Sequence, residues 1–447
     1  MARRDRLSRA FSSPTSLRSP RCGPRRRHST ARTSVASSDR VAAGGVTRPP
    51  ASRRGVTRPA HSRRGDRAAS PPPRRTHGNA QPPRGAGSGV DIFEPLTLGR
   101  TRLANRVAMA PLTRLRAGED GVPGDLLVEH YQQRAGLGLI ITEGTYPVRE
   151  GRTWIGQPGI ETDAQVAGWK RVTDAVHAAG GRIALQIMHG GRISHPEITG
   201  TGRVVSASAL AAPGEVRIPS GKADHPVAHA LEIDELPDVV RGFADAARRA
   251  IEAGFDAVEV HGANGYLIQQ FLAPSSNQRD DAYGRTPEGR ARLAIEVVTA
   301  VAEAVGADRT GIRLSPEHNI QGVVDSDPAE TAATYAALAA GIAPLGIAFV
   351  DILHADLRGE LVQAIRRDSG TLVIGNSGFS SQTTRDEASA LITEGVVDAV
   401  AVGRAAIANP DLIERWRHDA EENTPNPGTF YGPTGEGYID YPTLARV

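Results

Sequence analysis

Short apolar runs alternate with longer amphipathic stretches from Arg106 onward. Eight runs of four to six residues have the near-continuous apolar character of strands that are buried on both faces. The stretches 163–179 and 237–253 between them have the periodicity of helices, and Pro237 is expected at the first position of the second helix. The predicted strands are 106–110, 138–142, 183–188, 256–260, 311–314, 348–353, 371–375 and 399–402. This alternation predicts an α/β fold, a (β/α)8 TIM barrel.

Polar residues or glycines follow all eight predicted strands. In barrels of this kind, the loops after the C-terminal ends of the strands form the active site. Turns favour the same residue types in any protein, so the strand ends alone do not establish a site. The residues in question are Thr113, Gly144, Gln186 with His189, His261 with Asn264, Arg313, His354, 376–378, and Gly403 with Arg404.

The loops after the seventh and eighth strands are candidates for phosphate binding. They have the sequences GNSGFSS (375–381) and GRAAIANPDL (403–412). Glycines let the backbone approach a ligand closely, and the Arg404 guanidinium could bind a phosphate through two hydrogen bonds. Either loop alone is explained by turn glycines. Together, at these two strand ends, they favour a phosphate-bearing ligand.

A group of hydrogen-bonding residues follows the apolar run FDAVEV directly. His261 and Asn264 can both donate to one oxygen that gains negative charge during a reaction. Tyr266 is protonated at neutral pH and could supply a proton. Alternatively, His261 and Asn264 cap the helix that is expected to begin near Tyr266, and the spacing alone does not distinguish the two hypotheses.

Charge is distributed unevenly along the chain. Residues 1–90 carry 21 arginines, no lysine and three aspartates, a net charge of +18, which leaves −15 for residues 91–447. The first segment is rich in Pro, Ser and Gly and repeats VTRPPASRRG as VTRPAHSRRG. Such a composition cannot bury enough apolar surface to offset the entropy of ordering. We therefore expect a disordered tail at 1–90 and a single domain at 91–447.

The role of the tail is open. It is a transit peptide, an arm that binds nucleic acid or anionic membrane, or a non-functional extension from an upstream start codon. If the tail bound DNA and the barrel were a relic, binding would depend steeply on salt and would require residues 1–90. A barrel of charge −15 should repel DNA, so we expect no specific nucleic-acid partner.

Cysteine and hydropathy exclude several classes of function. Cys22 is the only cysteine, which rules out disulfides, a thiolate nucleophile and iron–sulfur ligation in 91–447. No apolar stretch approaches the roughly 18 residues that span a bilayer. We expect a cytoplasmic protein without a membrane partner or a metal site, either a monomer or a homo-oligomer.

Several motifs resemble the old yellow enzyme family of FMN-dependent ene-reductases, and most closely its N-ethylmaleimide reductase branch. The resemblance runs from about Ile92 to Leu444, essentially the whole predicted domain. The motifs, in the order of the family, are NRVAMAPLTRLRA (105–117), PGIETDAQVAGWKRVTDAVHAAGGRIALQ (158–186), HGANGYLIQQFLAPSSNQRDDAYG (261–284), GIRLSP (311–316) and VGRAAIANPDL (402–412). The related dienoyl-CoA reductases need an iron–sulfur cluster and a further nucleotide-binding domain, so we do not expect that activity.

The resemblance implies a non-covalent FMN and assigns its ligands. Pro111, Thr113 and Gly144 would lie against the isoalloxazine, and Gly144 takes the place of a usual alanine. Gln186 would bind the pyrimidine edge, and Arg313 would lie near N1 and O2. The phosphate would be bound by Ser377, Gly378, Gly403 and Arg404, the loops already identified from barrel geometry.

The resemblance also implies a mechanism. NADPH or NADH would reduce the flavin at N5, and an α,β-unsaturated carbonyl or nitro compound would then take the hydride in a ping-pong cycle. His261 and Asn264 would bind the substrate oxygen, and Tyr266 would protonate the α-carbon. A purely structural barrel is disfavoured because all these positions hold competent residues.

Two further departures from the family pattern bear on substrate range. Met188 occupies a position where relatives often carry an aromatic residue, and Trp154 stands where many place a tyrosine near the ring. The segment 192–231, between the third strand and its helix, is long and rich in Pro and Gly, and we predict a hairpin lid there. His189, His195 and His354 are expected to have structural or solvent-exposed roles, because no acidic or histidine partners recur around them at metal-binding spacing.

Overall fold

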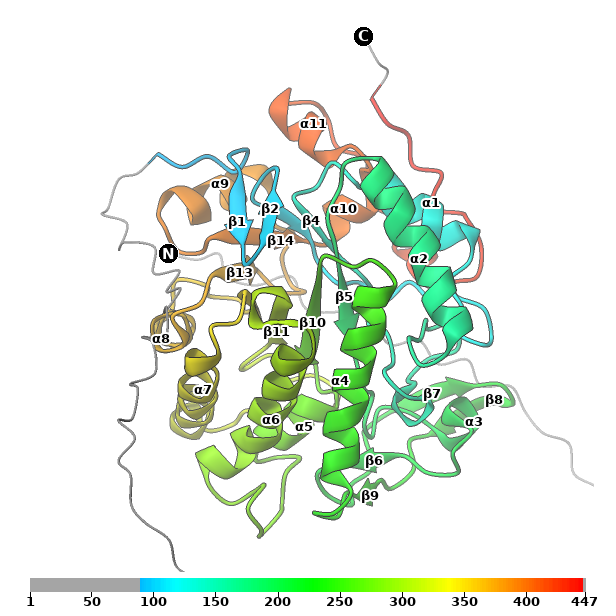
Figure 1. The fold of residues 1–447 in the computed structure, drawn as a ribbon, viewed down its shortest axis with the longest axis vertical. Helices are drawn as coiled ribbons and strands as arrows, with labels where there is room; N and C mark the ends of the chain where they lie inside the picture. Colours follow the sequence, from blue (N-terminus) through cyan, green and yellow to red (C-terminus); the bar gives the residue numbers. More distant parts are fainter. Residues whose placement is uncertain (1–88, 445–447) are drawn as a thin grey trace, which may run out of the picture. The chain divides into compact units, whose positions relative to one another are not determined.

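Eight parallel strands close into one barrel. The structure is a computed structural model that describes residues 89–444. Within these residues, the barrel order is β10, β11, β12, β13, β14, β3, β4 and β5 (Figure 1). The strands are β3 (Val107–Met109), β4 (Leu139–Ile141), β5 (Ile183–Ile187), β10 (Ala257–Gly262), β11 (Thr310–Leu314), β12 (Phe349–Leu353), β13 (Val373–Asn376) and β14 (Ala399–Val402). The predicted TIM barrel and all eight strands are confirmed, whereas the tail predicted for 1–90 lies, except for 89 and 90, outside the described residues.

Helices connect the successive strands around the barrel. They are α1 (Asp125–Gln133), α2 (Asp163–Ala178), α4 (Leu236–Glu252), α6 (Pro287–Val305), α7 (Pro328–Ile342), α8 (Glu360–Ser369) and α9 (Arg385–Thr393), with short helices α5 (Leu267–Leu272), α10 (Arg404–Ala408) and α11 (Leu412–Arg417). The two predicted helices are confirmed as α2 and α4. Thr162 and Gln165 form a capping box that starts α2. Pro237 lies at the second position of α4, not the first, because the helix begins at Leu236.

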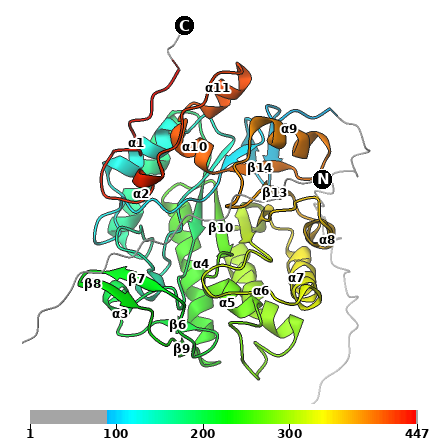
Figure 2. The same ribbon diagram turned by 180° about the vertical axis from the view of Figure 1, so that it is seen from behind.

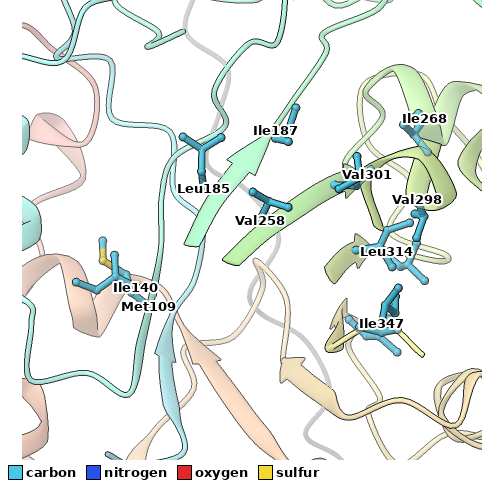
Figure 3. Close-up of a cluster of buried hydrophobic side chains, with 14 of the residues drawn as sticks. Met109, Ile140, Leu185, Ile187, Val258, Ile268, Val298, Val301, Leu314 and Ile347 are labelled. Atoms are coloured by element: carbon cyan, nitrogen blue, oxygen red, sulfur yellow. The ribbon is translucent and has the colours of Figure 1, made fainter. Parts of the chain in front are cut away.

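The larger core lies between the barrel and its helices. Strand residues alternate between two faces, and the outward-facing set meets the apolar side of each helix. Figure 3 shows Leu185, Ile187 and Val258 on β5 and β10, and Leu314 of β11 beside Val298 and Val301 of α6. Packing of this kind on every strand, together with the apolar residues that face the interior, explains why the runs are nearly continuous.

The half of the barrel interior at the N-terminal ends of the strands, the lower interior, is filled by apolar side chains and closed by a hairpin. Leu96 and Leu98 of β1 (Leu96–Leu98) and Leu103 of β2 (Thr101–Leu103) pack with the inward-facing residues of the barrel strands. Arg100 in the hairpin turn pairs with Asp308 at 2.7 Å. Because Asp308 precedes β11, the hairpin covers the N-terminal ends of the strands, and the opposite end carries the site.

The segment 192–231 leaves the C-terminal end of β5. It contains α3 (Pro196–Thr199) and an antiparallel hairpin of β7 (Glu215–Ile218) and β8 (Gly221–Asp224), which lie together in both views (Figures 1 and 2). Two-residue strands β6 (Val205–Ser206) and β9 (His229–Ala230) pair with each other in parallel. Its role as a lid stays a prediction.

Close packing inside the barrel predicts a strong steric effect at Gly311. A Cβ at this position would lie 2.3 Å from the Phe349 ring, which is fully buried. We expect Gly311→Ala to destabilise the protein by about 1–3 kcal/mol, because a rigid ring must move. In a Phe349→Ala background the same change should cost far less.

Thermal and denaturant unfolding of the four variants measures this coupling. Gly136→Ala is the matched control, because a Cβ there meets nothing within 4 Å. An equal cost of Gly311→Ala in both backgrounds would contradict the predicted collision.

Candidate active site

Four polar side chains face the interior at the C-terminal ends of the barrel strands, the upper end of the barrel. They come from neighbouring strands: Gln186 on β5, His261 on β10, Arg313 on β11 and Asp351 on β12. Gln186, Arg313 and Asp351 follow the inward-facing Ala184, Gly311 and Phe349, and His261 follows the inward-facing Glu259, because every second residue of a strand faces inward. All are buried, with 0–3% of their surface exposed. The barrel therefore changes from an apolar lower interior to a polar one where its strands end.

A cavity opens at this end of the barrel. It has about 430 Å³ of space not filled by atoms, its open mouth included. Five predicted cofactor residues line it together: Pro111, Arg313, Gly378, Gly403 and Arg404. Its other lining residues are Asn376, Phe379 and Ser381, which belong to the predicted phosphate loop 375–381, and Ala110, Leu112, Gln382 and Thr383, which were not predicted as site residues.

The glycine-rich loops border this cavity with little side-chain bulk. Gly378 has φ +92°, and a Cβ there would have no neighbour nearer than 4.0 Å. A Cβ at Gly403 would come no closer than 3.6 Å to Leu112. Arg404 donates to the Phe379 carbonyl, which ties the two loops together. Both glycines thus leave space in the cavity that a ligand can fill.

Ser377 differs from its predicted neighbours. It does not line the cavity, and its hydroxyl donates to Glu387 at 2.6 Å. The hydroxyl is therefore committed to a carboxylate. A contribution of Ser377 to phosphate binding would have to come from its backbone.

Glu143 fixes the backbone of the loop that carries Thr113. The Glu143 carboxylate accepts from the backbone N–H groups of Arg114 and Leu115 at 3.0 Å each. The Arg114 guanidinium donates to the carbonyls of Phe430 and Gly437 in the C-terminal segment and lies over the Tyr438 ring. This buried network holds the half-buried Thr113 next to the cavity-lining residues Pro111 and Leu112.

Gly144 and Met188 are complementary in shape. A Cβ at Gly144 would lie 2.5 Å from the Met188 sulfur. Met188 in turn packs with Ile193, Ala212 and Tyr266, and Trp154 covers this group. The two departures from the family pattern at 144 and 188 are therefore in contact, and the thioether occupies space that an alanine would take.

The apolar group defined by Met188 brings Trp154 to Tyr266. Burial raises the pKa of the Tyr266 hydroxyl above its usual value of 10.0, and the nearby Gln321 and Trp154 side chains partly oppose this rise. The Tyr266 ring meets the His261 ring edge-on, with centroids 5.1 Å apart. The predicted proton donor, substrate contact and oxygen donor therefore form one group.

His261 and Asn264 do not cap the helix that follows them. Helix α5 begins at Leu267 with Tyr266 as its N-cap, and no side chain caps it. The His261 Nδ1 atom instead accepts from the Ala263 N–H at 3.3 Å. This bond leaves the ring proton on Nε2, so the ring can donate from that atom. Burial and then the charge of Arg313 hold the pKa of His261 well below 6.5, which keeps the ring neutral.

Asn264 is held in an unusual conformation. Its φ is +55°, and its backbone is fixed by a 2.8 Å bond from its N–H to the Ser315 hydroxyl and a 2.6 Å bond from the Gln321 amide to its carbonyl. Its Oδ1 is buried without a partner among the described residues. Side chains held this way at backbone strain commonly serve a ligand.

Two buried acids were missed by the sequence analysis. Glu259 on β10 accepts from the Gln186 amide at 2.8 Å, and Asp351 on β12 forms an ion pair with Arg313. Both acids interrupt runs, DAVEV and AFVDIL, that were predicted to be buried apolar strands. A carboxylate inside an apolar strand was the signal that could have found them, because burial of an acid needs a compensating partner.

The other histidines named from the sequence have local partners. His189 accepts from the Gly191 N–H at 3.1 Å, and burial lowers its pKa to about 3. His195 caps α3, and His354 lies 3.3 Å from Glu317. In residues 89–444, no group of three or more His, Cys, Asp or Glu is arranged to hold a metal. Over the same range, no helix combines the length and the apolar character that crossing a bilayer requires.

Comparison with protein families and curated proteins gives concordant matches. Residues 91–423 match the family described as NADH:flavin oxidoreductase / NADH oxidase. A probable flavin mononucleotide-dependent alkene reductase of Leishmania infantum is 42% identical over 370 residues, 80% of this chain and 99% of the relative. The 12-oxophytodienoate reductase 7 of Oryza sativa subsp. japonica is 35% identical over 393 residues, 79% of this chain and 95% of the relative.

Solved structures agree with these matches. The old yellow enzyme homologue from Zymomonas mobilis has a TM-score of 0.75 at 40% identity and covers 79% of this chain and 100% of its own. Morphinone reductase in complex with tetrahydroNAD has a TM-score of 0.74 at 44% identity and covers 80% and 98%.

The contact between Gly144 and Met188 predicts a coupled effect on stability. Gly144→Ala should destabilise the protein by about 1–2 kcal/mol, because the buried Met188 side chain has to shift. In a Met188→Ala background, the added methyl group should be neutral or stabilising, since it enters the space that the thioether left. Denaturant unfolding of the four proteins measures the coupling, and strict additivity would argue against the contact.

Proposed function

This chain is a flavin-dependent oxidoreductase of the NADH:flavin oxidoreductase / NADH oxidase family, which includes the old yellow enzymes, and we propose that it uses FMN and NAD(P)H to reduce activated C=C bonds of α,β-unsaturated carbonyl compounds. The observation that carries this proposal is the connection of two halves of one site. Arg313 lines the cavity with the glycine-rich loops, and it is the register neighbour of His261 in the next strand.

The residues around the cavity fit FMN. Arg313 has a buried Nε–H without a partner among the described residues, which is available to a ligand acceptor. Gly378 and Gly403 leave space beside the backbone, and Arg404 supplies a cation at the same end for a phosphate. Gln186, Thr113 and Gly144 would contact the isoalloxazine, and Pro111 would lie against it.

FMN, when bound, supplies a site that accepts a hydride from a nicotinamide and passes it to a second substrate. We infer that both substrates use the same face in turn, a ping-pong cycle. The complex of morphinone reductase with tetrahydroNAD supports a nicotinamide as the electron donor.

The role of His261 and Asn264 follows from their protonation and position. The neutral imidazole donates from Nε2, and the amide nitrogen of Asn264 would be the second donor. Two fixed donors directed at a carbonyl oxygen stabilise the negative charge that develops there when hydride reaches the β-carbon. The same donors would bind the oxygens of a nitro group.

Tyr266 is proposed as the acid that protonates the α-carbon. Burial raises the pKa of its hydroxyl, which stays protonated at neutral pH, and the ring packs with Met188 and meets the His261 ring. General acids of this kind contribute about 10²–10⁴ in rate.

The first test of the function uses the full chain. The purified protein should carry a yellow chromophore that FMN reconstitutes. Anaerobic titration with NADPH should bleach it, and 2-cyclohexenone should restore the colour. A protein that stays colourless with FMN would overturn the proposal.

Tyr266→Phe separates the two half-reactions. We expect enone reduction to slow by about 10²–10⁴, because the α-carbon loses its proton donor, while reduction by NADPH stays nearly unchanged. Stopped-flow absorbance measures both steps. Tyr283→Phe is the matched control, because its hydroxyl bonds Glu296 elsewhere in the fold. Equal losses in both half-reactions would remove this role from Tyr266.

Removal of both oxygen donors should weaken the binding of phenols, whose oxygen is expected in the same position. In His261→Ala/Asn264→Ala we expect a loss of about 10–1,000-fold in affinity, since each donor to a charged oxygen contributes roughly 1.5–3 kcal/mol and such effects are not additive. Calorimetric titration with a phenol checks this, and unchanged affinity would place the phenol elsewhere.

A further inference from the structure

A buried network of four side chains includes Arg313, which lines the cavity. Strand register places Gln186 of β5 beside Glu259 of β10, and Arg313 of β11 beside Asp351 of β12. Glu259 and Asp351 are completely buried, and Gln186 and Arg313 are each 2% exposed. The members of this network, defined by these four residues, therefore interact with one another in the absence of bulk water.

The two acids hold the two residues that are assigned to the flavin pyrimidine. Glu259 accepts from the Gln186 amide at 2.8 Å, and Asp351 pairs with the Arg313 guanidinium. The carboxyl groups of Glu259 and Asp351 are also close enough for each to shift the pKa of the other. Neither acid takes part in the proposed binding or protonation of the substrate.

The charges of the network do not balance if both acids are ionised. Two carboxylates face one guanidinium, and an uncompensated charge in a dry interior is costly. Glu259 Oε2 and Asp351 Oδ1 are each buried without a donor. His261, two residues along β10, is neutral and adds no charge. One proton added to the network brings its net charge to zero and supplies the missing donor.

We propose that Glu259 is an uncharged positioning residue, which carries a proton that it shares with Asp351 so that the two acids together fix Gln186 and the cavity-lining Arg313. The proton belongs on Glu259 because the guanidinium is bonded to Asp351 and favours the ionised form there. Burial and the charge of Asp351 both raise the pKa of Glu259 well above its usual value of 4.5, and Arg313 only partly opposes this. For Asp351, burial also raises the pKa, but the charge and hydrogen bond of Arg313 both lower it.

The shared proton has a consequence for the cavity. With Glu259 neutral, the charge of Arg313 is balanced by a single carboxylate, and the guanidinium keeps one free N–H for a ligand. This last link rests on the proposed function. The protonation of Glu259 itself does not, and it is tested without FMN.

The direct test is infrared spectroscopy of the FMN-free protein at neutral pH. Wild type should show the carbonyl-stretch band of an un-ionised carboxylic acid, and Glu259→Gln should lose it. Asp351→Asn should lose it as well, because Arg313 is then free to pair with an ionised Glu259. Glu303→Gln makes the same chemical change at an exposed position of α6 and should keep the band. A band that persists in either network variant overturns the proposal, and the second variant serves if the first does not fold.

Unfolding at several pH values gives an independent readout. A native acid with a raised pKa holds a proton that the unfolded chain releases above its own pKa. Stability is therefore lost as pH rises between the unfolded and the folded pKa. The unfolding equilibrium constant of wild type should rise about tenfold more per pH unit than that of Glu259→Gln between pH 6 and 7. Equal slopes would show that Glu259 is ionised in the native state.

The midpoint potential of bound FMN tests the link to the site. Glu259→Gln should leave the potential unchanged, because an amide replaces a neutral acid. A shift to a more positive value would show that a negative charge was removed and would overturn the proposal. If FMN does not bind at all, the proposed function fails, but the vibrational and pH measurements still decide the protonation of Glu259.

Discussion

The alternation of strand residues inside a closed barrel is the constraint on which the rest depends. Each strand gives every second side chain to an interior that water does not fill, so the interior must be apolar or internally paired. The lower interior takes the first solution, with Ala, Leu, Ile and Phe side chains. The upper interior takes the second, where Arg313 meets Asp351 and Gln186 meets Glu259. The site lies where the apolar interior meets the paired polar groups, because these groups still have unused hydrogen-bonding atoms that a ligand can reach.

Much of the fold followed from the sequence because its signals are local. Eight apolar runs and the helical periodicity between them were sufficient for the barrel, and α2 and α4 began within one residue of expectation. The hairpin of β1 and β2 was not anticipated, since three-residue strands have no periodicity to detect. Its leucines are informative only once the barrel that they close is known.

The candidate site was predictable where residues lie at strand ends and was hidden where they lie within strands. Arg313, Gly378, Gly403 and Arg404 indeed line one cavity. Glu259 and Asp351 were overlooked because an acid within an apolar run looks like an exception until its partner on the next strand is visible. The contact of Gly144 with Met188 joins positions 44 residues apart in the chain, and no local pattern could have linked them.

The hairpin that closes the lower end of the barrel has a kinetic consequence. Leu96, Leu98 and Leu103 seal the base beneath the apolar layer, and the network of Gln186, Glu259, Arg313 and Asp351 lies above it. A proton that enters or leaves this network has to pass through the opening at the C-terminal ends of the strands. A tightly bound cofactor would block this opening. The protonation state of the network would then be fixed when the cofactor binds. After a sudden change of pH, the cofactor-bound enzyme would adjust slowly and with hysteresis, at a rate set by how often the cofactor dissociates.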